Sequence, residues 1–189
     1  RKHEIRENTD KLMDLTDRAV AELATGGEKA DLVVWPEGGF RLDLRYWTDL
    51  RNYASSWGRM TDEFLNYQKD LGTWLITGTQ DHEETVYRDG SKEKKNFNSA
   101  VLLDPNGDID GFYHKIRLVP FSEHFPLDKE KYAGLYEMFQ KYDISNWSVG
   151  DERKVFEADQ MRIAAPICFE DVFPDHVRRF VGNGVDIIL

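Results

Sequence analysis

Ile163-Ala-Ala-Pro-Ile-Cys-Phe-Glu-Asp171 is the stretch that decides the fold, because a short apolar run typical of a buried strand ends there at a thiol beside two carboxylates. Cys168 is the only cysteine among the 189 residues. The segment 173–182 is predicted to be a helix, whose N-terminal amides would face the thiol and favour a thiolate. A lone cysteine is more often a small core residue, so the thiol by itself is only a candidate nucleophile.

Two other strand ends carry residues that complement a thiol. Leu32-Val-Val-Trp-Pro-Glu37 is a predicted buried strand stopped by proline, with a carboxylate at its end. Phe112-Tyr-His-Lys115 is a second predicted strand end, and it presents an ammonium group. Glu37 could be a solvated turn residue and Lys115 a charge on an edge strand. Together with Cys168, however, they supply a base for the thiol proton and a cation for an oxyanion, which indicates covalent catalysis at a carbonyl.

The order of these three motifs resembles the carbon–nitrogen hydrolase (nitrilase) superfamily. The resemblance extends from about residue 30 to the end of the chain. It implies that Glu37 is the general base, Lys115 the stabilising cation and Cys168 the nucleophile. It also implies an α/β fold of the αββα sandwich type.

Two segments refine the resemblance toward the apolipoprotein N-acyltransferase family: 118–127, directly after Lys115, and Phe-Pro-Asp at 173–175. This resemblance implies that Glu123 and Glu170 are supporting active-site carboxylates. It also places Phe169 beside the nucleophile where the family commonly has tyrosine, and Ser122 where the family commonly has glycine.

The implied reaction moves an acyl chain from a phospholipid, through a cysteine thioester, to the N-terminal amine of a diacylglyceryl lipoprotein. The implied location is the periplasmic or other extracytoplasmic side of a bacterial membrane, reached through membrane segments outside this chain. Apolar residues in 40–47 and 132–139 either contact acyl chains there or pack in the core. A soluble amidase or nitrilase acting on a small amide or nitrile is the alternative, and a non-catalytic binding descendant of the fold is a third reading.

The composition of the chain bears on these hypotheses. The chain is 40% hydrophobic and long enough for one core, which predicts a single domain over 1–189. The formal net charge of -10 argues against a nucleic-acid partner. The histidines at 114, 124 and 176 lack metal-ligand spacing, so we predict neither a metal nor another cofactor. No apolar run approaches the roughly 20 residues that span a bilayer.

The predicted elements alternate between helices and strands, which indicates a layered α/β fold. Helices are expected over 5–23, 44–70, 132–142 and 173–182, and strands over 31–35, 73–78, 98–103, 109–115, 154–157, 161–168 and 185–189. A charged loop is expected over 81–95, and a tight turn over Asp104-Pro-Asn-Gly107. The chain begins on a helix and stops inside a predicted strand, so we expect a fold incomplete at both ends and a fragment of a longer protein.

Overall fold

Two β-sheets form the centre of the computed structural model, which describes residues 2–128, 130–141 and 146–189. The first sheet has the order β1 (Leu32–Val34), β2 (Trp74–Val86), β3 (Lys92–Leu103) and β4 (Ile109–His114). β1 is parallel to β2, and the other neighbours are antiparallel. The second sheet contains β5 (Phe156–Ala158), β6 (Met161–Ala164) and β7 (Ile187–Ile188), with β6 between the other two.

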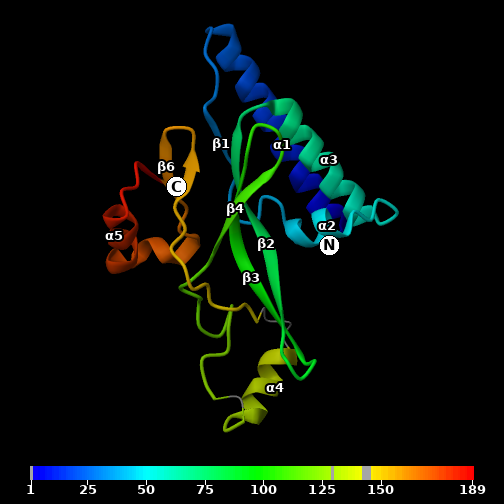
Figure 1. Cartoon of the computed structure of the whole chain (residues 1–189), viewed down its shortest axis with the longest axis vertical. Helices are drawn as coiled ribbons and strands as arrows, with labels where there is room; N and C mark the ends of the chain where they lie inside the picture. The colour runs from blue at the N-terminus through cyan, green and yellow to red at the C-terminus, as the bar shows by residue number, and fades with distance from the viewer. Residues whose placement is uncertain (1, 129, 142–145) are drawn as a thin grey trace.

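Helices flank the two sheets, so that the layers follow the order helix, sheet, sheet, helix from right to left in Figure 1. On one side lie α1 (Lys2–Thr25), α2 (Leu44–Leu50) and α3 (Ser56–Leu71), and α5 (Pro174–Gly182) lies beyond the second sheet. Asp43 caps the first turn of α2 and Ser55 that of α3. Gly72 ends α3 in the left-handed conformation, with φ of 64°. The predicted αββα order is therefore present in the structure.

The two faces of the first sheet belong to separate apolar clusters, because successive side chains of a strand point to opposite faces. Ile76, Leu102 and Tyr113 pack toward the second sheet, and Leu75 and Val101 pack toward the helices. The first of these clusters lies between the sheets, beside the segments that carry Glu37, Lys115 and Cys168.

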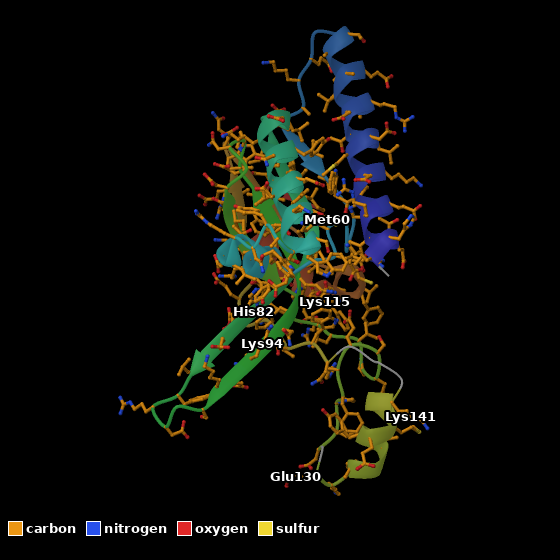
Figure 2. The ribbon with its side chains drawn as sticks, turned by 90° about the vertical axis from the view of Figure 1, so that its right-hand side faces the viewer. Met60, His82, Lys94, Lys115, Glu130 and Lys141 are labelled. Atoms are coloured by element: carbon orange, nitrogen blue, oxygen red, sulfur yellow. The ribbon has the colours of Figure 1, made fainter. Side chains whose placement is uncertain are left out.

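The prediction of a charged loop over 81–95 is wrong, because this segment forms the outer half of a long antiparallel hairpin. β2 and β3 remain paired residue by residue as far as Val86 and Lys92. Glu83 lies opposite Lys95 and Glu84 opposite Lys94, so opposite charges face each other across the two strands. Backbone pairing and these cross-strand pairs extend the ribbon beyond the core, as Figure 2 shows.

The two apolar segments considered for acyl contact differ in burial. Phe40, Leu42 and Leu44 are buried against the first sheet, so packing explains most of the segment 40–47. Leu135 and Met138, on α4 (Ala133–Lys141), are 39% and 51% exposed, and this helix projects away from the layers (Figures 1 and 2). Among the described residues, no helix combines the length and apolar composition needed to cross a bilayer.

Candidate active site

Glu37 lies three residues beyond β1 and lines a pocket between the two sheets. Asn98 on β3 donates a hydrogen bond from Nδ2 to Oε1 of Glu37 at 2.9 Å. The backbone turns at Gly38, whose φ is 64°, and passes so close to β2 that a Cβ at Gly78 would lie 2.3 Å from the Gly38 nitrogen. The sheet therefore fixes the position of the Glu37 backbone, while the carboxylate remains partly open to solvent.

Lys115 follows β4 directly, and its side chain is completely buried. Its Nζ donates to Oε1 of Glu123 at 2.8 Å and lies 3.9 Å from Oε1 of Glu37. The second oxygen of Glu123 accepts the Val119 N–H at 2.8 Å. A buried ammonium needs such partners, since an unpaired charge inside a protein is costly. Glu123 thus fixes both the ammonium and the loop that follows it.

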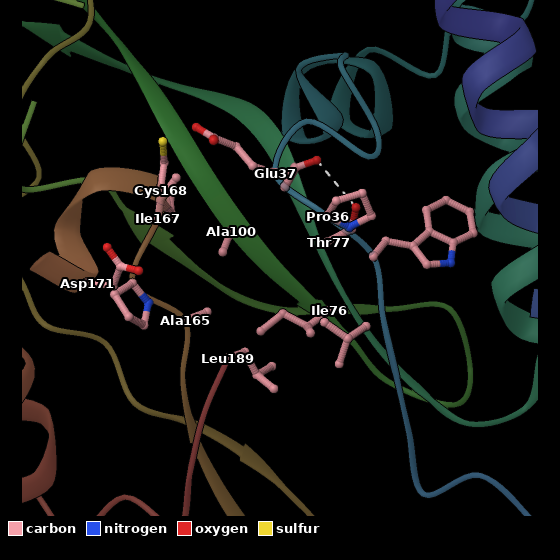
Figure 3. A pocket seen from close by; sticks show the side chains of 14 residues that line it. Pro36, Glu37, Ile76, Thr77, Ala100, Ala165, Ile167, Cys168, Asp171 and Leu189 are labelled. Carbon is pink, nitrogen blue, oxygen red and sulfur yellow. Dashed lines mark hydrogen bonds between the residues drawn. The ribbon is translucent and has the colours of Figure 1, made fainter. Parts of the chain in front are cut away.

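The sequence predicts that Cys168 ends a strand, but in the structure it does not. β6 stops at Ala164, Pro166 follows, and the thiol is on the first residue of a 3₁₀ helix, η1 (Cys168–Val172). Its φ is 53°, in the left-handed region that non-glycine residues seldom adopt. Figure 3 shows the Cys168 thiol and the Glu37 carboxylate at the same end of one pocket.

The surroundings of Cys168 favour the protonated thiol over the thiolate. Burial raises the pKa of Cys168, and the negative charge of Glu37 together with a hydrogen bond to it raises the pKa further. The Lys115 charge and the Phe169 N–H act in the opposite direction without reversing the shift. The expectation that helix amides would produce a thiolate is therefore wrong in its net effect, and a nucleophilic Cys168 would need a base.

Glu170 and Phe169 occupy different environments, although both adjoin the thiol. Glu170 is fully buried and accepts the backbone N–H groups of Ile116, Arg117 and Ile167 at 2.8–2.9 Å. It therefore links the backbone after Lys115 to the backbone before Cys168, rather than contacting the ammonium itself. Phe169 is 44% exposed, and its ring packs edge-on against Phe173.

A pocket of about 320 Å³ opens beside Glu37 and Cys168. Apolar side chains from the first sheet and from the segments that follow β6 and β7 line much of it: Val34, Ile76, Ala100, Ala165, Ile167 and Leu189. Figure 3 shows the carboxylate and the thiol on one side of the pocket and Leu189 on the other. The site can therefore hold an apolar group next to the reactive side chains.

A second polar cluster lies where the N-terminus of α2 meets β2. Asp43, Asp81 and His82 have ligand atoms within 4.8 Å of one another. Arg45 already binds both oxygens of Asp81 at 2.8 Å, and His82 Nδ1 lies 2.6 Å from Asp43. Because these partners occupy the potential ligand atoms, we propose no metal there, and the absence of a metal stays a prediction.

Asn98 was missed as a site residue by the sequence reasoning. It is a polar residue in an apolar strand, next to another polar residue, Ser99, and nothing in the local pattern separates the two. Only the register of β3 against its neighbours puts Asn98 on the same face of the sheet as the candidate site.

The chain belongs to the carbon–nitrogen hydrolase family, whose model matches residues 2–189. Its relatives include apolipoprotein N-acyltransferase 1 of Treponema pallidum, which is 34% identical over 84% of this chain and 30% of its own length. Apolipoprotein N-acyltransferase of Chlorobaculum tepidum is 30% identical over 96% of this chain and 34% of its own length. The chain thus spans about a third of the length of these relatives.

Solved structures agree on the fold. A carbon–nitrogen hydrolase from Helicobacter pylori superposes with a TM-score of 0.62 at 17% identity, over 97% of this chain and 53% of its own. The NitN amidase from Neterenkonia sp. AN1 gives a TM-score of 0.54 at 18% identity, over 95% of this chain and 59% of its own. At these identities the likeness supports the fold and leaves the substrate open.

Proposed function

We propose that this chain is the catalytic part of an N-acyltransferase that moves a fatty acyl chain from a phospholipid to the N-terminal amine of a lipoprotein. One observation carries the chemistry: a buried lysine lies 3.9 Å from the Glu37 carboxylate, which lines the same pocket as the Cys168 thiol. The similarity to apolipoprotein N-acyltransferases supports the choice of substrates.

In the proposed first half-reaction, Glu37 takes the Cys168 proton as the sulfur attacks the ester carbonyl of the phospholipid. Lys115 and the Phe169 N–H stabilise the oxyanion, and one such donor typically accounts for about 10²–10³ in rate. The C–O bond then breaks, and the leaving alcohol takes the proton from Glu37. A thioester on Cys168 remains.

In the second half-reaction the amine attacks the thioester and loses a proton to Glu37. The C–S bond breaks, the sulfur recovers the proton, and an amide is released. Water in place of the amine would give hydrolysis. The apolar lining of the pocket and the exposed apolar residues of α4 favour an acyl substrate over a small polar amide.

The proposal places the protein at a bacterial membrane, with this chain on the extracytoplasmic side and acting as one domain. Membrane attachment would come from segments outside it, as the length of the relatives allows. Neither a metal nor another cofactor is part of the proposed reaction.

A direct test is mass spectrometry of the protein containing this chain after incubation with phospholipid. We expect an acyl adduct on the Cys168 peptide that neutral hydroxylamine removes, since a thioester is cleaved where an amide is not. The Cys168→Ala variant should carry no adduct. Ammonia release from small amides, without any adduct from phospholipid, would instead establish the hydrolase alternative.

A further inference from the structure

The carboxylate of Glu170 is the end of a buried hydrogen-bond chain that extends to α5. The Tyr113 hydroxyl lies 2.9 and 2.8 Å from the two Glu170 oxygens and 3.2 Å from Nε2 of His176. All three side chains are completely buried. The chain joins β4 to η1 and α5, two consecutive elements that lie far from β4 in the sequence.

The direction of the hydrogen bonds follows from the available protons. Burial and the charge of Glu170 raise the pKa of Tyr113, so its single proton is retained and donated to the carboxylate. Nε2–H of His176 is then the donor to the tyrosine oxygen, and the same nitrogen also lies 3.4 Å from Oε1 of Glu170. Nδ1 of that ring is the bare nitrogen, in keeping with its lack of a hydrogen-bond partner among the described residues.

A neutral imidazole suits this arrangement. Burial lowers the pKa of His176, and the positive charges of Arg153 and Arg117, on the segments before β5 and after β4, lower it further. Glu170 on η1 and Asp175 on α5 act in the opposite direction without reversing the shift. The ring therefore serves as a fixed donor rather than as a second buried charge.

The chain ends at the backbone that holds the thiol. Glu170 accepts the Ile167 N–H through the same oxygen that is 2.8 Å from the Tyr113 hydroxyl. Cys168 comes next, with its left-handed φ of 53°. Non-glycine residues keep such a conformation only where the surroundings enforce it. A Glu170 carboxylate held from behind by Tyr113 and His176 provides that constraint.

We propose that Tyr113 and His176 are positioning residues, which orient Glu170 and through it hold Cys168 and the backbone after Lys115 in the reactive geometry. Neither touches the pocket or the reacting atoms. The inference rests on the proposed role of Cys168 as the nucleophile.

The test measures thioester formation with a short-chain p-nitrophenyl ester, which reports the first half-reaction as a burst of p-nitrophenolate and requires neither phospholipid nor lipoprotein. Tyr113→Phe removes a hydrogen bond to the Glu170 carboxylate, and His176→Leu leaves the Tyr113 oxygen without its donor; each change should slow the burst by about tenfold. His176→Gln should recover most of the rate, because its amide N–H can replace Nε2–H. The KM for the ester should change little.

Phe180→Leu is the matched control, since Phe180 packs against both rings without entering the chain. It should lower the thermal midpoint and leave the burst rate of the folded protein unchanged. A wild-type burst rate in Tyr113→Phe, or equal loss in His176→Gln and His176→Leu, would show that the two residues only pack.

If the variants bind the ester poorly, a crystal structure of His176→Leu tests whether His176 helps to hold the Cys168 backbone. Cys168 should leave the left-handed region in that structure, and an unchanged φ would refute the inference. The two proposals can fail separately. A normal burst without transfer from phospholipid would refute the acyltransferase reading, and the comparison among variants would still test the chain.

Discussion

Replacing Glu123 with glutamine tests how the buried ammonium is held. The two carboxylate oxygens serve different donors, Lys115 Nζ and the Val119 N–H, both at 2.8 Å. Glutamine offers one oxygen, so one donor loses its partner and the lysine loses its nearer counter-charge. Removing one partner of a buried ion pair typically costs about 3–5 kcal/mol, and the lower figure applies because Glu37 remains 3.9 Å away.

A loss of about 3 kcal/mol leaves the protein folded, given total stabilities of about 5–15 kcal/mol, and should lower the thermal midpoint by about 6–12 °C. The ammonium should move toward Glu37 and away from the oxyanion, which should slow thioester formation by about 100-fold. Burst kinetics and thermal unfolding measure the two effects. Glu152→Gln, which removes an exposed carboxylate, is the control. If both variants matched in burst rate and midpoint, Glu123 would have no part in holding Lys115.

Further predictions concern the thiol, its partners and the polar cluster. Cys168→Ala should abolish turnover and Cys168→Ser should leave at most a trace, as acyl transfer assays would show. Alkylation of Cys168 by iodoacetamide should have a pH midpoint above that of a free thiol, because burial and Glu37 raise the pKa of Cys168. Glu37→Gln should lower this midpoint, and an unchanged midpoint would contradict the contact between Glu37 and the thiol. Lys115→Met should slow the thioester burst, and an unchanged burst rate would exclude Lys115 from the oxyanion site. Burial opposes ionisation of Asp81, but hydrogen bonds from His114 and Arg45 lower the pKa of its carboxyl group. The ionised carboxylate therefore stabilises the fold above pH ~4, and this stabilisation is lost as the pH falls through the lowered pKa. Asp81→Asn should therefore cost about 2 kcal/mol in urea unfolding at pH 7 and progressively less as the pH falls below ~4, and a loss that does not change with pH would rule out the ion pair as its cause.

The layered fold could be predicted because its inner strands are apolar and its turn residues are distinctive. Asp104-Pro-Asn-Gly107 connects β3 to β4 as expected. The outer half of the β2–β3 hairpin could not be predicted in the same way. In the sequence alone, its charged residues look like those of a solvated loop. They favour pairing of the two strands only when the register places Glu83 opposite Lys95.

The candidate site shows the same division. Glu37, Lys115 and Cys168 each follow an apolar strand, so local patterns suggest that they meet. His176 and Asn98 carry no such signal, because their contacts depend on register and on helix placement across 61 to 63 positions of sequence. The strained backbone of Cys168 was also hidden, since a strand ending at Ala164 and a 3₁₀ helix starting at Cys168 look like one continuous run.

The near contact at Gly78 limits how this protein can evolve. A single added methyl group would lie 2.3 Å from the Gly38 nitrogen and 2.8 Å from the Glu37 Cα, both backbone atoms that no rotamer change can clear. In a saturation library selected for activity, position 78 should accept only glycine, although it lies within a β-strand where glycine is intrinsically unfavourable. Any other residue at position 78 would require a different backbone path around Glu37.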